Sequence, residues 1–122
     1  MFRRWIGMSL AAVVLGVGGA VAVAQPAHAG WDDCPAGALC AWLGPNGTGG
    51  TPGKVYGNNN DLSIYTKFRY AESVANNGQR CDVNIYTGRS RTGNVQLLRR
   101  GYVWNLAGTP FYHHVYSNYW VC

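Results

Sequence analysis

The sequence predicts an all-β sandwich that is built from two similar halves and stapled by two disulfides. Three observations support this fold class. No window repeats apolar residues at the spacing of an amphipathic helix. Short runs rich in Val, Ile, Tyr, Trp and Thr are separated by Gly, Asn and Pro, a pattern typical of short strands and tight turns. The chain also matches itself without gaps when it is shifted by 44 residues.

The N-terminal segment is typical of an export signal. Two arginines precede an uncharged stretch, Trp5–Ala24, and small residues follow at Ala27 and Ala29, where signal peptidase requires them. We therefore expect residues 1–29 to be a secretory signal peptide, removed before Gly30. A membrane anchor is the alternative, because about 20 apolar residues can cross a bilayer. The Gly and Ala content and the Ala-x-Ala site favour cleavage and a secreted protein without membrane contact.

The remaining chain, residues 30–122, is long enough for one domain of 93 residues. Without the two N-terminal arginines it has 8 basic and 5 acidic side chains, a net charge of +3. So modest a charge, with no recognition motif, argues against a nucleic-acid partner. A secreted chain of this size buries only a modest core, so covalent staples are expected.

Four cysteines survive removal of the signal: Cys34, Cys40, Cys81 and Cys122. An even number in an oxidising compartment predicts two disulfides, for which three connectivities exist. Cys34 and Cys40 would close a tight loop whose proline and glycine suit a turn, and Cys81 and Cys122 then pair by elimination. A zinc site is the less favoured alternative, because Cys81 and Cys122 have no ligand at a short spacing.

Three strands can be placed from composition. Val83–Tyr86 and Val95–Leu98 are expected to be strands joined by the hairpin connection Thr87–Gly93, and Tyr116–Val121 is expected to be the last strand.

The 44-residue repeat carries a structural pattern. In each half an aromatic residue is followed seven positions later by glycine, and a serine comes near the end of the half. We expect a folded-over hairpin in which glycine adopts a backbone conformation that other residues avoid. The late serine would hydrogen-bond back onto that hairpin. The residues concerned are Trp42, Gly49 and Ser73, and their counterparts Tyr86, Gly93 and Ser117.

This doubled pattern resembles the Greek-key repeat of βγ-crystallins, and the whole mature chain resembles the small secreted actinobacterial proteins of peptidase inhibitor family I36. The family resemblance is carried by Cys34–Cys40, Glu72–Gly78 and the ending Tyr119–Cys122. It implies a βγ-crystallin-like double Greek-key β-sandwich over residues 30–122, with repeats at about 34–78 and 79–122.

The resemblance implies a secreted inhibitor that binds an extracellular peptidase, as the Streptomyces metalloproteinase inhibitor of this family does. In that inhibitor the bond presented to the protease is held in a second short disulfide loop, which this sequence lacks. The unmatched candidate for the contact is the Gly-rich stretch Gly44–Gly53, for which an ordinary hairpin turn is the favoured interpretation.

An alternative function is a crystallin-like cell-wall or surface-binding module, which could be toxin-like. Arginines gather in the second half. The simpler interpretation is a solvated face, and the functional interpretation is a patch that binds an anionic polymer such as teichoic acid. These arginines are Arg89, Arg91, Arg99 and Arg100. Exposed aromatic residues could add a binding surface. They are Tyr56, Tyr65, Tyr70, Tyr102 and Tyr119.

Metal and catalytic chemistry are not expected. The βγ-crystallin calcium pattern would place Phe68 and Arg69 in one half, and Tyr112 and His113 in the other, at ligand positions, where no carboxylate is available. The stretch 59–63 resembles the pattern out of register. His113 and His114 would face opposite sides of a strand, so they could not serve one site. We expect a monomer that is not an enzyme and has no cofactor.

Overall fold

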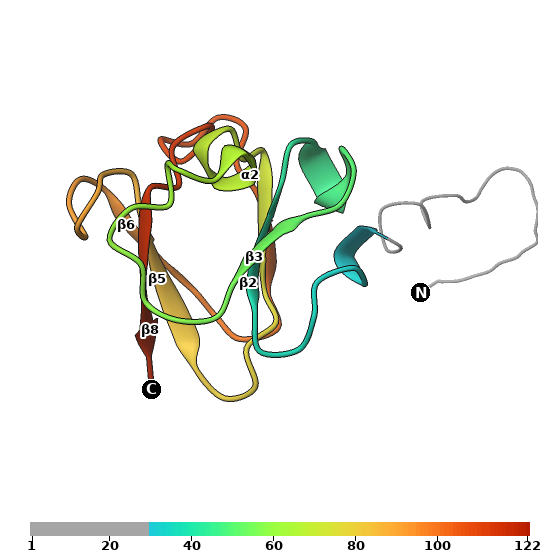
Figure 1. The fold of residues 1–122 in the computed structure, drawn as a ribbon, viewed down its shortest axis with the longest axis horizontal. Coiled ribbons are helices and arrows are strands. Elements are labelled where there is room, and N and C mark those ends of the chain that lie inside the picture. The colour runs from blue at the N-terminus through green and yellow to red at the C-terminus, as the bar shows by residue number, and fades with distance from the viewer. Residues whose placement is uncertain (1–29) are drawn as a thin grey trace, which may run out of the picture.

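A computed structural model describes residues 30–122, and the expected signal peptide lies outside the described residues. Two antiparallel sheets face one another (Figure 1). One has four strands in the order β3-β2-β4-β7, and the other has three in the order β6-β5-β8. The predicted all-β sandwich is confirmed.

The elements are short. The four-stranded sheet contains β2 (Leu39–Trp42), β3 (Gly53–Val55), β4 (Ser73–Asn76) and β7 (Val103–Asn105). The three-stranded sheet contains β5 (Asp82–Tyr86), β6 (Val95–Leu98) and β8 (Ser117–Val121). The helical elements are one turn each, η2 (Pro45–Gly47) and α2 (Thr66–Arg69). Strand β6 covers the four residues predicted for it, and β5 and β8 differ from prediction by one residue at their starts.

Alternation along the strands builds the core between the sheets. In β5, Val83 and Ile85 are buried, while the intervening Asn84 and Tyr86 are half-buried on the outer face. Residues from both sheets and from the connections fill the inner space, and Trp104 and Trp120 pack against them. The core cluster is Leu39, Ala41, Val55, Leu62, Phe68, Ala71, Val74, Val83, Ile85, Leu98, Leu106, Phe111 and Val115.

The second half contributes one strand to the sheet of the first half. Strand β7 belongs to the second half but pairs with β4 of the first, with Trp104 opposite Val74. In return, Asn59 of the first half forms an isolated bridge with Asn118 of β8. The four-stranded sheet is therefore built from both halves, and a single bridge ties the first half to the three-stranded sheet.

The connections divide between the two ends of the sandwich. Helix α2 and the hairpin connections that follow β2 and β5 lie at one end, and the chain terminates at the other (Figure 1). We call these the α2 end and the C-terminal end. Among residues 30–122, no helix is long and apolar enough to cross a bilayer.

Candidate functional site

Each hairpin is held by a buried serine from the end of its own half. Ser73 Oγ donates to the carbonyl of Gly44 at 2.8 Å and accepts from the amide of Gly47 at 3.0 Å. Ser117 Oγ donates to the carbonyl of Gly88 at 2.6 Å and accepts from the amide of Arg91 at 2.9 Å. Both serines are fully buried. The two connections are therefore pre-ordered by matching hydrogen bonds.

The hairpin glycines have the backbone conformation that the repeat requires. Gly49 has φ +89° and Gly93 has φ +77°. A Cβ at Gly49 would lie 2.6 Å from the amide nitrogen of Gly44, and one at Gly93 would lie 2.3 Å from Thr87 Oγ1. Glycine is therefore required both by the left-handed backbone and by close contact across the turn.

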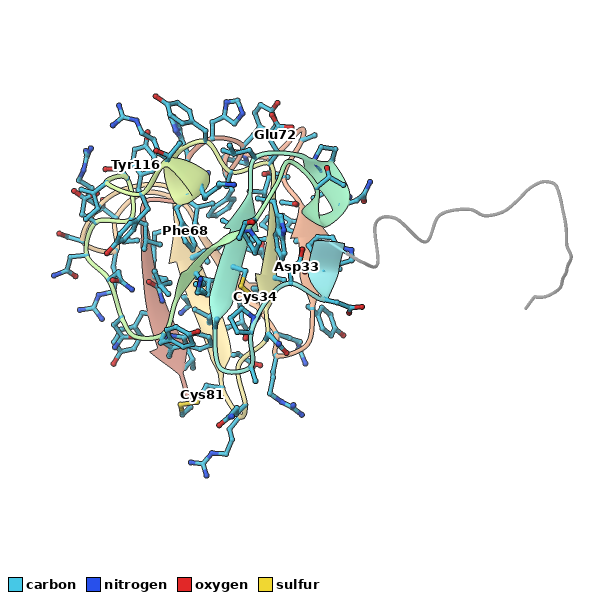
Figure 2. All side chains as sticks on the ribbon, turned by 45° about the vertical axis from the view of Figure 1, so that its right-hand side comes forward. Asp33, Cys34, Phe68, Glu72, Cys81 and Tyr116 are labelled. Atoms are coloured by element: carbon cyan, nitrogen blue, oxygen red, sulfur yellow. A yellow bond between two sulfur atoms is a disulfide. The ribbon has the colours of Figure 1, made fainter. Side chains whose placement is uncertain are left out.

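The two disulfides, Cys34–Cys40 and Cys81–Cys122, occupy different regions. Cys34 lies over the four-stranded sheet, and Cys81 lies at the C-terminal end (Figure 2). The first forms part of a second apolar cluster, in which Trp31 packs edge-on against Trp42 with ring centroids 5.0 Å apart. This cluster covers the outer face of the four-stranded sheet.

The structure does not bring the four arginines together. Arg89 and Arg91 precede β6 at the α2 end, whereas Arg99 and Arg100 follow it at the C-terminal end. Strand β6 separates the two pairs, so they do not form one patch.

The pair at the α2 end contacts aromatic rings of the same domain. The guanidinium of Arg89 lies 5.3 Å from the ring centroid of Tyr116, and that of Arg91 lies 4.4 Å from that of Tyr119. Arg89 Nε also lies 3.2 Å from Asp61 Oδ1 and donates to Ser63 Oγ at 3.2 Å. These contacts hold Arg91 against β8, and Arg89 against the connections that precede α2 and β8.

The out-of-register calcium stretch has a structural role of its own. Asp61 Oδ1 accepts from both the amide and the hydroxyl of Ser63 and pairs with Arg89. The pKa of Asp61 is lowered, first by the Ser63 hydroxyl and to a smaller extent by Arg89. Within residues 30–122, no three His, Cys, Asp or Glu side chains form a group that could hold a metal.

The expectation that His113 and His114 lie on a strand is wrong. They lie in the connection before β8, and His113 has φ +61°. His113 is half-buried and its Nε2 lies 3.2 Å from Glu72 Oε2, while His114 is exposed. The connection turns here because the amide of His113 donates to the carbonyl of Ala71 at 2.9 Å.

Glu72 is the shared acceptor of a small cluster at the α2 end (Figure 2). Tyr112 Oη donates to Glu72 Oε2 at 2.9 Å, and the Tyr112 and His113 rings stack 4.0 Å apart. Hydrogen bonds from His113 and then Tyr112 lower the pKa of Glu72, and the same carboxylate raises the pKa of Tyr112. These groups hold the 106–116 connection against the first half.

The stretch Gly44–Gly53 is tied down as a hairpin connection. Asn46 and Asn105 exchange two hydrogen bonds of 2.7 Å, one from the Asn46 amide and one from the Asn105 side chain. Lys67 Nζ donates to the carbonyl of Thr51. The loop is therefore engaged with β7 and α2.

A different segment is the longest uninterrupted exposed stretch of the described chain: Arg89–Leu97, nine residues. It runs from the second hairpin into β6, which is an edge strand. Within it, Val95 is 54% and Leu97 is 39% exposed. The sequence predicts this strand but not its position at an edge, because only the sheet order shows that β6 lies there.

The five tyrosines expected at the surface are all exposed. They are spread over both ends and both sheets rather than gathered on one face. Tyr70 and Tyr112 flank His113, and Tyr119 underlies Arg91.

Comparison with known proteins supports both the fold and the family. The sequence pattern of peptidase inhibitor family I36 matches residues 27–98. A solved structure described as "Evolution of the eye lens beta-gamma-crystallin domain fold" is 22% identical with a TM-score of 0.62, covering 72% of this chain and 89% of that one. A second, "IPSE alpha-1, an IgE-binding crystallin", is 18% identical with a TM-score of 0.52, covering 70% and 82%. The fold is therefore that of the βγ-crystallins. The search of curated proteins gave no match.

Proposed function

The chain belongs to peptidase inhibitor family I36, and we propose that it is a secreted inhibitor that binds an extracellular metallopeptidase through the segment Arg89–Leu97. The observation that carries the choice of segment is its uninterrupted exposure on an edge strand. The proposed metallopeptidase target follows the family resemblance. Export follows the proposed signal peptide and is consistent with the two disulfides.

The segment has the form that a peptidase cleft accepts. An edge strand offers main-chain donors and acceptors on its free side, and its alternate side chains can enter pockets. Val95 and Leu97 are such alternate side chains, because they pair with Tyr86 and Asn84 on the outer face. One edge group is already engaged, since Gln96 Nε2 donates to the Leu97 carbonyl at 3.0 Å.

The segment is also held at both ends, so binding would cost little ordering entropy. At its start the amide of Ser90 donates to the carbonyl of Asn60 at 2.7 Å, and that of Arg91 donates to Ser117 Oγ. At its other end Leu98 is buried in the core. This anchoring takes the place of the short disulfide loop that the sequence lacks.

Titration of thermolysin, with subtilisin as a non-metallopeptidase comparison, tests the proposal. We expect inhibition of thermolysin, weakened about 30-fold by Val95→Glu or Leu97→Glu, the size of a loss of about 2 kcal/mol at a binding hot spot. Val103→Glu is the matched control, because Val103 is 48% exposed on β7, an edge strand of the other sheet. Equal weakening by Val103→Glu, or no inhibition of either enzyme at micromolar concentration, would contradict the proposal.

A further inference from the structure

We propose that a hollow at the C-terminal end of the sandwich binds a sugar that carries a carboxylate group. The hollow has a volume of about 530 Å³, which lies within the range of small-molecule pockets, about 300–1,000 Å³. Its principal lining residues are Gly37, Tyr56, Gly57, Gly78, Arg80 and Trp120. They come from four segments that are distant in sequence.

The walls of the hollow are fixed by the fold. Trp120 Nε1 donates to the carbonyl of Gly57 at 3.2 Å, and the Trp120 amide donates to Asn58 Oδ1 at 2.7 Å. A Cβ at Gly78 would lie 2.8 Å from Trp120 Cζ3, so glycine is needed to admit the indole. The Cys81–Cys122 disulfide is also part of the lining. A ligand would therefore meet a preformed site.

Two side chains at the hollow contribute little to holding the fold together. Tyr56 is 57% exposed and Arg80 is exposed. Neither side chain makes a hydrogen bond or ion pair within residues 30–122, in contrast to Arg89, which is paired with Asp61. Because Tyr56 and Arg80 both line the hollow and have no such partners, they are available to a ligand.

The combination of groups specifies the class of ligand. Aromatic rings such as Tyr56 and Trp120 pack against the apolar C–H face of a sugar ring, and the amides of Asn58 and Gln79 can bond its hydroxyls. Arg80 can bind a carboxylate with two parallel hydrogen bonds. No Asp or Glu side chain lines the hollow, and the one acidic group in its lining is the main-chain carboxylate of the terminal residue, Cys122.

The hollow is separate from the proposed peptidase contact. It lies at the C-terminal end, between β8 and the segment after β3, whereas Arg89–Leu97 begins at the α2 end and continues into β6, the other edge strand of the sheet. Substitutions at one surface should therefore leave the other intact. Failure of sugar binding would not bear on inhibition, and the reverse also holds.

NMR titration of the ¹⁵N-labelled protein with trigalacturonic acid tests the proposal, with its uncharged methyl ester as a matched ligand. We expect the amide signals of Gly57, Gly78 and Trp120 to shift with the acid and the affinity for the ester to be at least about tenfold lower. Arg80→Gln and Tyr56→Ala should each weaken binding of the acid about tenfold and leave thermolysin inhibition unchanged. Arg100→Gln removes an exposed arginine outside the lining and should have no effect.

Monomeric galacturonic acid identifies the source of the ligand. Shifts with both the monomer and the trimer would assign a single sugar acid, and shifts with the trimer alone would assign an acidic polysaccharide; both support the site. The proposal is overturned if no shift occurs at millimolar ligand, if the ester binds as tightly as the acid, or if Arg100→Gln weakens binding as much as Arg80→Gln.

Discussion

The outer faces of the two sheets differ, although both sheets bury their inner faces in the same core. On the four-stranded sheet the outer face is covered by Trp31 and the Cys34–Cys40 disulfide. On the three-stranded sheet the outer face carries exposed large side chains, namely Val95, Leu97, Tyr119 and Val121.

Equivalent positions show how the sequence makes this difference. A shift of 44 residues takes the buried Cys40, Trp42 and Ala75 of the first half to Asn84, Tyr86 and Tyr119 of the second. The second-half residues are polar or amphipathic and tolerate water, so no covering segment is needed. The first half thus covers its outer face with further apolar packing, and the second half leaves its outer face exposed.

The largest expected contrast is between Trp42 and its counterpart Tyr86. Trp42→Ala should lower the free energy of unfolding by about 3–5 kcal/mol, because it opens a cavity under Trp31. Tyr86→Ala, at a half-buried position, should cost about 1 kcal/mol. Urea unfolding, monitored by circular dichroism, measures both values. Equal losses would show that the two outer faces contribute equally to stability.

The two hairpin serines, unlike the two outer faces, should contribute equally to the free energy of unfolding. Ser73→Ala and Ser117→Ala should each lower the free energy of unfolding by about 1–3 kcal/mol, because each leaves a buried carbonyl and amide without their partner. The same unfolding experiment serves as the readout. A loss of stability for Ser73→Ala alone would mean that only the hairpin of the first half contributes to stability.

The smallest effect concerns pH and the Glu72 cluster, which joins the two halves. The folded-state pKa of Glu72 lies below its ordinary value of 4.5. Its stabilisation is therefore present above pH 4.5 and is lost as the pH falls through the lowered value. Between pH 6 and pH 3 the melting temperature of wild type should fall slightly more than that of Glu72→Gln. Asp61, whose pKa is also lowered, is present in both proteins and cancels in the comparison. Equal falls in melting temperature for the two proteins would show that Glu72 makes no contribution.

Local pattern predicted much of this fold. Strand Val95–Leu98 could be placed because β-branched and apolar residues follow a turn, and Ser73 and Ser117 could be paired because glycine, aromatic residue and serine keep one register. Such signals act over a few residues or repeat at a fixed distance. They determine which segments form strands and which residues hold the hairpins.

The relations between distant segments could not be predicted in this way. Nothing local indicates that β7 pairs with β4 of the other half or that β6 lies at an edge. The separation of Arg91 from Arg99 and the turn at His113 also depend on that topology. The proposed peptidase contact and the proposed sugar-binding hollow depend on sheet order, so neither could be predicted from the sequence.

Hydrogen–deuterium exchange of the protein, free and bound to thermolysin, tests most directly whether the peptidase binds the second half through Arg89–Leu97. We predict that binding protects amides of Arg89–Leu97 and leaves the exchange of Gly44–Gly53 and of the covered face around Trp31 unchanged. Protection confined to Gly44–Gly53 or to the covered face, with no change in Arg89–Leu97, would contradict this prediction.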